Sequence, residues 1–235
     1  MKRVLAVCFL LLTLSLSAQE RMAVYPREDF KASKAILTSP LYGKDMVVIG
    51  DSYVQNAGRP IEETWHYKLA LKYNMEYHNY GWNGNCLAYD WGEQYGPPLY
   101  ERYLTLPERA DYVVVCAGHN DAVLINRYGD SMDFFRSKLV ILCEGLIARY
   151  PEAKICFVTP WESPQPMFKE TTETILEVCG SYGIAVFDSS KYSGIHPRFK
   201  GIRSLYFQSP DDAAHLNARG HNLVLPRMER FLLSI

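Results

Sequence analysis

The sequence predicts an α/β fold: a three-layer α/β/α sandwich around a five-stranded parallel sheet. Short, continuous apolar runs alternate along the chain with longer segments of helical periodicity. Strands of this kind are buried on both faces, which is typical of a parallel sheet covered by helices on each side. Right-handed crossovers distribute those helices over the two faces. We expect one domain over residues 19–235, because the sequence contains no repeat, linker or low-complexity stretch.

Five runs have the length and apolar composition of buried strands. The run at 46–49 is wholly apolar and is bounded by Gly50, and the run at 112–117 is a clear buried strand. The run at 75–80 has a weaker pattern. In chain order, the expected strands are residues 46–49, 75–80, 112–117, 154–159 and 184–188.

Four segments place apolar side chains on one face at helical spacing. The segment at 131–150 is followed by Pro151, and the segment at 167–182 ends before Gly183, as expected where helices stop. The preceding residues 20–43 are a mixed lead-in to which we assign no element. The expected helices are residues 61–73, 131–150, 167–182 and 217–233.

Residues 1–18 have the pattern of a secretory signal peptide. A basic start is followed by a short apolar run and by small residues before a cut after Ala18. The apolar run at 4–16 is shorter than the roughly 20 residues that a spanning helix needs. Cys8 lies inside that run and not at the cut site, so we expect no lipid anchor. The protein should be exported, to the periplasm or the medium, without stable membrane insertion.

The charge balance and the cysteine and histidine patterns exclude several classes of function. The formal net charge is -1, and no run of five like charges occurs, so nucleic acid is not an expected partner. After removal of Cys8 an odd number of widely spaced cysteines is left, which indicates buried free thiols and no disulfide framework. Cys86 differs by lying in a loop rich in Gly and Asn. The six histidines lack metal-ligand spacing, so we expect neither a metal nor another cofactor.

Polar and glycine-rich segments follow the first two expected strands. The ligand crevice of a parallel sheet lies beyond the carboxyl ends of its strands. Ser52, behind Gly50 and Asp51, can stand exposed there at a helix N-terminus, although Asp and Ser are also ordinary helix caps. In the loop at 79–85, two glycines permit a close backbone approach to a ligand, but they also suit a plain turn.

Two further polar groups come later in the chain. Asn120 follows the third expected strand and offers an amide donor at the same sheet edge, or forms a local turn. Asp212 and His215 are three residues apart, so in a helical turn both lie on one side. The carboxylate can then hold the imidazole in one tautomer and leave its other nitrogen free as a base. Each group alone is ordinary, but together they supply a nucleophile, a base and hydrogen-bond donors.

These blocks resemble those of the SGNH hydrolases, also called the GDSL esterase/lipase family. Ser52 in Gly-Asp-Ser is similar to the first block, and Asn120 in Gly-His-Asn-Asp to the third. Gly84, in the Asn-x-Gly-x-x-Gly-Asn stretch from 79 to 85, is similar to the second, and Asp212 and His215 in Asp-Ala-Ala-His to the last. The blocks run from residue 50 to 215, which is most of the chain.

The resemblance implies a flavodoxin-like sandwich and a set of site residues. Ser52 would be the nucleophile, His215 the general base and Asp212 the group that orients it. The Ser52 and Gly84 backbone N–H groups and the Asn120 side chain would form the oxyanion hole.

The chain also departs from the family pattern. Tyr53 stands where the motif has Leu, and His119 fills the variable position of the third block. Gly81 competes with Gly84, but the glycine followed by Asn is the matching one. Asp211 competes with Asp212, which alone has the three-residue spacing to His215.

Aromatic residues in the expected site loops bear on the substrate. Flat rings beside polar groups suit stacking on sugars, but they also suit packing of the domain. We expect Trp82, His119 and Trp161 to bind substrate, and we expect an exported esterase that removes acetyl or another small acyl group from a carbohydrate. A lipid or lysophospholipid esterase, or a thioesterase, is the alternative within the family. A non-catalytic glycan-binding module is the alternative from another class. The rings in these loops are Trp82, Tyr89, Trp91, Tyr95 and Trp161.

Overall fold

A computed structural model describes residues 23–25, 33–163 and 166–235. The expected signal peptide at 1–18 lies outside these residues and stays a prediction. Within the described part of the chain, no helix combines the length and the apolar character needed to cross a membrane.

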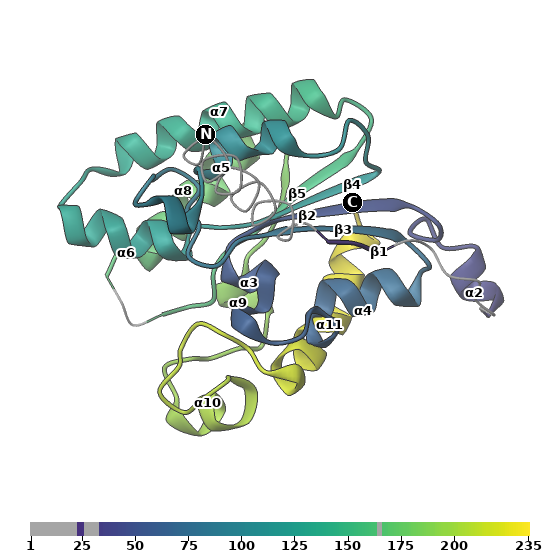
Figure 1. Cartoon of the computed structure of the whole chain (residues 1–235). Coiled ribbons are helices and arrows are strands. Elements are labelled where there is room, and N and C mark those ends of the chain that lie inside the picture. The colour runs from purple at the N-terminus through teal and green to yellow at the C-terminus, as the bar shows by residue number, and fades with distance from the viewer. Residues whose placement is uncertain (1–22, 26–32, 164–165) are drawn as a thin grey trace, which may run out of the picture.

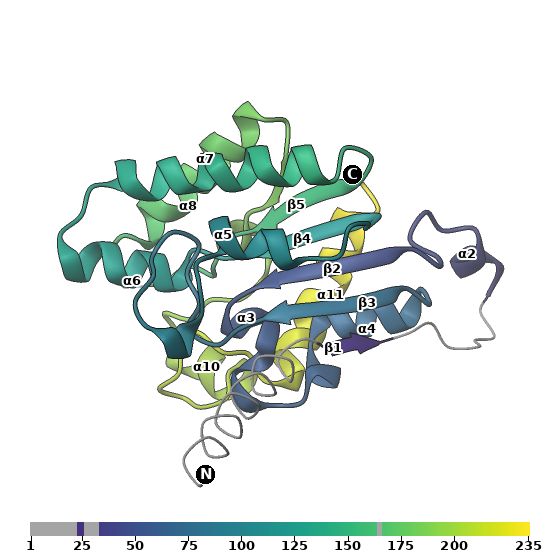
Figure 2. The same ribbon diagram turned by 45° about the horizontal axis from the view of Figure 1, so that its top comes forward.

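A six-stranded sheet forms the middle layer, in the order β1-β3-β2-β4-β5-β6 (Figure 2). The strands from β2 to β6 pair in parallel, which confirms the predicted five-stranded parallel sheet. β1 was not predicted. It adds to the edge by pairing antiparallel with β3, and its three residues are too short to show a periodicity. The strands are β1 Ala23–Tyr25, β2 Asp45–Gly50, β3 Glu76–Gly81, β4 Tyr112–Cys116, β5 Lys154–Val158 and β6 Ala185–Phe187.

Four of the helices are those that the apolar spacing predicted: α4, α7, α8 and α11. α4 begins later than expected, because the Thr64 side chain accepts a hydrogen bond from the Tyr67 backbone N–H and caps the helix there. Most of the helices that were not predicted have only one or two turns. The helices are α2 Lys34–Leu37, α3 Ser52–Gln55, α4 Trp65–Lys72, α5 Leu99–Arg102, α6 His119–Tyr128, α7 Met132–Arg149, α8 Phe168–Ser181, α9 Ser189–Tyr192, α10 Lys200–Tyr206 and α11 Ala218–Leu232.

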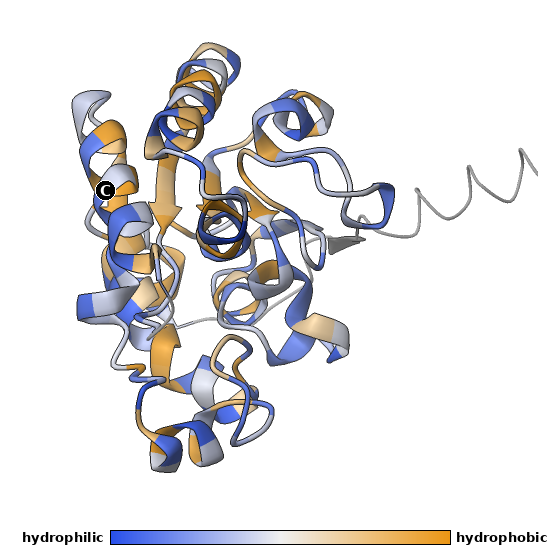
Figure 3. Cartoon of the chain, turned by 90° about the vertical axis from the view of Figure 1, so that its left-hand side faces the viewer, coloured by the Kyte–Doolittle hydropathy of each residue, from blue (hydrophilic) through white to orange (hydrophobic). Residues whose placement is uncertain are grey.

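Two apolar clusters join the sheet to the helices on its two faces. Val47 and Ile49 of β2 belong to the cluster that includes α7 and α8, whereas Met46 and Val48 belong to the one with α4 and α11. Successive side chains of a strand point to opposite faces, so one wholly apolar strand serves both clusters. Figure 1 shows these helix pairs on opposite sides of the sheet, and in Figure 3 the visible strands are coloured mainly as hydrophobic.

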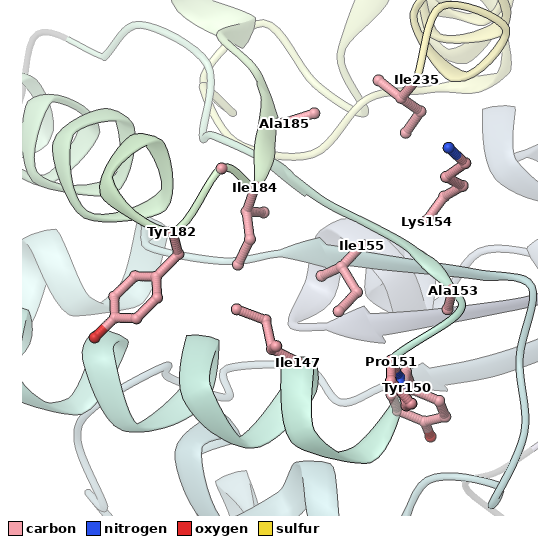
Figure 4. Close-up of a pocket in the computed structure, with 11 residues that line it drawn as sticks. Ile147, Tyr150, Pro151, Ala153, Lys154, Ile155, Tyr182, Ile184, Ala185 and Ile235 are labelled. Atoms are coloured by element: carbon pink, nitrogen blue, oxygen red, sulfur yellow. The ribbon is translucent and has the colours of Figure 1, made fainter.

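An open pocket of about 430 Å³ lies at the amino ends of β5 and β6 (Figure 4). Its lining is largely apolar and includes Ile147, Ile155 and the C-terminal Ile235. The polar groups singled out in the sequence follow the opposite, carboxyl ends of the strands. We therefore expect the reactive groups at the carboxyl ends of the strands, where α3 and α6 lie (Figure 2).

Candidate active site

Ser52 stands at the start of α3, directly beyond the carboxyl end of the central strand β2. A Cβ at Gly50 would lie 2.2 Å from the Cys116 carbonyl oxygen, so only glycine lets the chain turn here against β4. The buried Asp51 caps α3, because its Oδ1 accepts a 2.8 Å hydrogen bond from the Tyr53 N–H. Asp51 of the Gly-Asp-Ser motif is therefore a helix cap, as one interpretation of the sequence predicted. The same hydrogen bond fixes the turn at which Ser52 stands.

The structure brings Ser52, His215 and Asp212 together from opposite ends of the chain. His215 Nε2 lies 3.0 Å from Ser52 Oγ, and His215 Nδ1 lies 3.0 Å from Asp212 Oδ2. The second carboxylate oxygen of Asp212 accepts from the backbone N–H groups of Ala214 and His215, at 2.8 and 3.0 Å. These bonds close the turn that carries the imidazole, so its orientation is built into the loop before α11.

The hydrogen bonds around Asp212 also set its charge. Partial burial acts to raise the pKa of this carboxyl group, but the hydrogen bonds from the side chain and backbone of His215 outweigh it, and the pKa lies below its ordinary value. An ionised carboxylate accepts from Nδ1–H and leaves Nε2 free to take a proton from Ser52. Chemically, this arrangement can deprotonate a serine hydroxyl as it attacks a carbonyl carbon.

The loop after β3 carries the two glycines that compete for the oxyanion hole. The Gly81 N–H already donates to Asn79 Oδ1 at 2.8 Å. A Cβ at Gly81 would lie 2.3 Å from the backbone nitrogen of Gln55, so this glycine is needed for packing against α3. Gly84 has φ +78°, a conformation that favours glycine, and among the described residues nothing accepts from its N–H. This difference favours Gly84 as the donor.

Asn120, in the first turn of α6, lies in space between Asp51 of the first block and Asn85 of the second. Its Nδ2 donates to the Asn85 carbonyl oxygen at 2.9 Å and lies 3.5 Å from Asp51 Oδ2. The side chain is thus held next to the residue that precedes Ser52 and next to the loop that contains Gly84. All of the residues predicted for the oxyanion hole therefore lie at one edge of the sheet.

Two buried charged residues that the sequence analysis did not single out hold this loop in place. Asp121 accepts from the Leu87 and Ala88 N–H groups at 2.9 and 2.8 Å. Arg102 donates to the Gly50 carbonyl oxygen at 2.9 Å and to Asn85 Oδ1 at 3.0 Å. Asp121 is the last residue of the third block and was within reach of sequence reasoning, whereas nothing around Arg102 in the sequence marks it.

Burial shifts the pKa values of these charged groups. It raises the pKa of Asp51 to about 7, against the effect of the Tyr53 N–H hydrogen bond, and the pKa of Asp121 to about 6. Burial also lowers the pKa of Arg102 to about 10. Charged groups in a low-dielectric site are costly unless their hydrogen bonds are satisfied, which explains the dense hydrogen bonding around them.

The three residues expected to bind substrate have different surroundings. Trp82 is half-buried, and its Nε1 donates to the Gln94 carbonyl oxygen at 2.9 Å. Trp161 is only 3% exposed, donates to the Ala214 carbonyl oxygen at 2.7 Å and stacks on Tyr53. It offers little surface to a ligand and instead supports the turn that carries His215. His119 is half-buried at the site, with Nδ1 2.9 Å from the Tyr53 hydroxyl.

The cysteines of the described residues are free and buried, as their pattern predicted. Cys86, the one that the sequence left open, is 1% exposed, and burial raises the pKa of its thiol, so it is not a reactive thiolate. In the described part of the chain, no cluster of three or more His, Cys, Asp or Glu residues could hold a metal ion.

Comparisons with known proteins agree with this fold. The family model of the GDSL-like lipase/acylhydrolase family matches residues 48–223, well over half of the chain. No curated protein matches the sequence. A solved structure of a Lactobacillus plantarum protein is similar, with a TM-score of 0.70 and 23% identity over 82% of this chain and 98% of the other.

Two other similar structures are a lipolytic protein and a carbohydrate esterase. A member of the lipolytic G-D-S-L family from Veillonella parvula has a TM-score of 0.58 and 16% identity, over 79% of this chain and 96% of the other. An active-site mutant of a family two carbohydrate esterase from Clostridium thermocellum has a TM-score of 0.62 and 15% identity, over 82% of this chain and 64% of the other. At these identities the likeness shows the fold alone.

The chain belongs to the GDSL-like lipase/acylhydrolase family, which is the SGNH family that its motifs resemble. Membership of this family defines it as an ester-hydrolysing enzyme.

Proposed function

We propose that this protein is an exported serine esterase that removes small acyl groups, acetyl first among them, from a carbohydrate. The observation that carries the proposal is the 3.0 Å contact of Ser52 Oγ with His215 Nε2, with the imidazole held from behind by Asp212. Export is supported by the signal-peptide pattern of residues 1–18.

The reaction proceeds by transfer of the acyl group to Ser52 and then to water. Ser52 Oγ attacks the ester carbonyl carbon while His215 Nε2 accepts its proton. The tetrahedral intermediate collapses, the bond to the alcohol oxygen breaks, and His215 gives the proton to that oxygen. Water then attacks the acyl-enzyme with His215 again as the base, and the acid is released from Ser52.

Charge on the carbonyl oxygen is stabilised by donors at the same edge of the sheet. The donors are the Ser52 N–H at the start of α3, the Gly84 N–H and the Asn120 amide, which donates to the Asn85 carbonyl oxygen when no substrate is bound. They are fixed before substrate binds, because Asp121 and Arg102 hold the loop and its strand ends. Preorganised donors of this kind contribute about 3 kcal/mol each to transition-state stabilisation in a related reaction.

Three observations support a small acyl group on a polar alcohol. The loop after β3 is rich in rings and polar groups, with Trp91 and Tyr95 stacked at 4.1 Å and the half-buried Trp82 nearby. One structural neighbour is a carbohydrate esterase by its description. A pocket of about 370 Å³ lies at the carboxyl ends of β5 and β6, where polar side chains such as Glu162, Asp188 and His196 surround a surface that is more apolar than polar. The polar side chains suit hydroxyl groups, and the apolar surface suits the face of a sugar ring.

Hydrolysis of p-nitrophenyl acetate by wild type and Ser52→Ala tests the serine mechanism. The variant should lose activity by a factor on the order of 10⁵ or more, because the nucleophile is gone. Ser137→Ala, on the exposed face of α7, is a matched control and should hydrolyse the ester at the wild-type rate. Equal rates for wild type and Ser52→Ala would disprove the serine mechanism and favour the glycan-binding module.

A panel of acetylated glycans and of acyl esters of increasing chain length tests the substrate. We expect the highest kcat/KM for acetyl groups on sugars. A clear preference for long acyl chains or for thioesters would replace the carbohydrate proposal with the lipid esterase or thioesterase alternative.

A further inference from the structure

Tyr53, the residue that departs from the family motif, forms part of the wall of the site. It follows Ser52 in α3 and is only 8% exposed. Its ring stacks on Trp161, with centroids 4.6 Å apart, and its hydroxyl lies 2.9 Å from His119 Nδ1. A leucine at this position could not make the second contact, so the Tyr53–His119 pair is a property of this chain's own sequence.

The contacts of the Tyr53 hydroxyl decide which nitrogen of His119 carries the proton. A buried hydroxyl needs an acceptor for its proton. Among the described residues, the acceptor in reach is His119 Nδ1, while the Trp161 backbone N–H acts as a donor to the phenol oxygen. The Tyr53 O–H therefore donates to Nδ1, and the imidazole carries its own proton on Nε2.

Both side chains are neutral at pH 7. Burial raises the pKa of Tyr53 well above its ordinary value. Burial, with His215 adding to the effect, lowers the pKa of His119 to about 4. His119 Nε2 is thus an uncharged N–H donor, which suits a hydroxyl or ether oxygen better than an anion.

The Nε2–H of His119 is open to a ligand. The residue is half-buried. Within the described chain, its Nε2 has no hydrogen-bond partner and remains accessible to solvent. His119 adjoins Asn120 in α6, and its ring packs edge-on against Phe168 at 4.8 Å. Phe168 also lines the pocket of about 370 Å³ beside the site.

The position of His119 relative to His215 indicates which half of the ester it meets. In the proposed reaction His215 gives its proton to the leaving oxygen, so the alcohol half must lie on the His215 side. His119 lies close to that side, because the charges of His215 and Asp212 both act on its imidazole. Tyr53 also links it through Trp161 to the Ala214 carbonyl next to His215. We infer that His119 donates a hydrogen bond from Nε2–H to the alcohol half of the substrate, with Tyr53 holding the imidazole in that tautomer. This inference rests on the proposed function.

The test compares kcat/KM for an acetylated methyl glycoside with kcat/KM for p-nitrophenyl acetate, whose leaving group carries no hydroxyl. The ratio of the two values should fall about tenfold in His119→Phe, which keeps a ring but loses the donor. His119→Gln, which restores an N–H at similar reach, should recover the ratio to within about threefold of wild type. The control His78→Phe, on β3, should leave the ratio unchanged.

The contribution of Tyr53 is tested by a double-mutant cycle. Tyr53→Phe should lower the same ratio in the wild-type background and have no further effect in the His119→Phe background, since the two residues act as one unit. Equal ratios for wild type and His119→Phe, or equal losses for the Phe and Gln variants, would overturn the inference.

The inference and the proposed function fail in different ways. Ser52→Ala activity equal to wild type on both esters would overturn the proposed serine esterase function. An enzyme that loses both activities in Ser52→Ala, but shows no dependence of the ratio on His119, would remain a serine esterase without this specificity contact.

Discussion

At the scale of single residues, the Asp212 carboxylate both stabilises a turn and orients the imidazole of His215. It accepts three hydrogen bonds: from the backbone N–H groups of Ala214 and His215 and from His215 Nδ1. The first two shape the turn, and the third fixes the tautomer of His215, the proposed base. The spacing of Asp212 and His215 was visible in the sequence, but their distance from Ser52 depends on a loop that returns from the far end of the chain.

Substitution of Asp212 by Asn should separate these two contributions. The amide can still accept from the backbone through its oxygen, but its NH₂ group faces His215 Nδ1 and favours the tautomer with the proton on Nε2, which cannot act as a base. We expect kcat to fall on the order of 10⁴-fold in Asp212→Asn and more in His215→Ala, with little change in the thermal midpoint. Steady-state kinetics at pH 7 and thermal unfolding are the measurements. A larger loss in Asp212→Asn than in His215→Ala would contradict these roles.

At the scale of elements, the short helix α3 depends on glycine at two strand ends. Gly50 lets β2 turn against β4, and Gly81 lets the end of β3 lie against the α3 backbone. The sequence indicated that glycines in this region permit a close approach to a ligand. The structure assigns Gly81 to a close approach between two parts of the chain itself, and leaves Gly84 as the candidate for the substrate.

Gly81→Ala should therefore displace α3 and impair both stability and activity. The new Cβ would lie 2.3 Å from the Gln55 backbone nitrogen, and backbone cannot move aside as a flexible side chain can. We expect a loss of roughly 2–4 kcal/mol in the free energy of unfolding and at least a tenfold loss in kcat. The control is Gly43→Ala, where φ is +67° but nothing lies within 4 Å, so only about 1 kcal/mol should be lost. Urea unfolding and esterase kinetics measure both; equal losses of stability would refute the packing role.

The sequence predicted the longer elements but not the short ones. α7 and α8 are set by apolar residues at helical spacing, and β2 and β4 by continuous apolar runs; both are local signals. α6, whose first residues include His119 and Asn120, was missed because its beginning has the composition of a polar loop. β1 was missed because three residues carry no period, and its place is decided by pairing with β3.

At the scale of the whole molecule, a buried polar network lies beneath α3. His66 is fully buried, with Nδ1 2.6 Å from the Tyr77 hydroxyl and 3.0 Å from Thr64 Oγ1. Burial lowers the pKa of His66 to about 3, so the folded protein keeps this residue neutral where the unfolded chain would be protonated. Protons then bind preferentially to the unfolded state between these two pKa values, and stability is lost as the pH falls below about 6.5.

Acid should therefore destabilise wild type more than His66→Gln. Between pH 6.5 and pH 5, His66 lowers the free energy of unfolding of wild type by about 2 kcal/mol. Glutamine does not titrate, so His66→Gln lacks this loss. Urea unfolding at pH 7, 6 and 5 measures the difference between the two proteins at each pH. His196→Gln, at an exposed histidine, should follow wild type. Parallel pH dependences for wild type and His66→Gln would contradict the assignment.

By itself, the sequence determined the layers of the fold and the four blocks that meet at the carboxyl ends of its strands, where we propose catalysis. Apolar periodicity is local, and the carboxyl ends of parallel strands must lie at one edge, so Ser52, Gly84 and Asn120 were placed together by topology. Only the tertiary structure decided which of the neighbouring candidate residues face the site and which pack against other parts of the chain. The close approach of Gly81 to Gln55, the burial of Trp161 against the His215 turn, and the pairing of Tyr53 with His119 join residues that are far apart in the sequence, and no local pattern encodes such contacts.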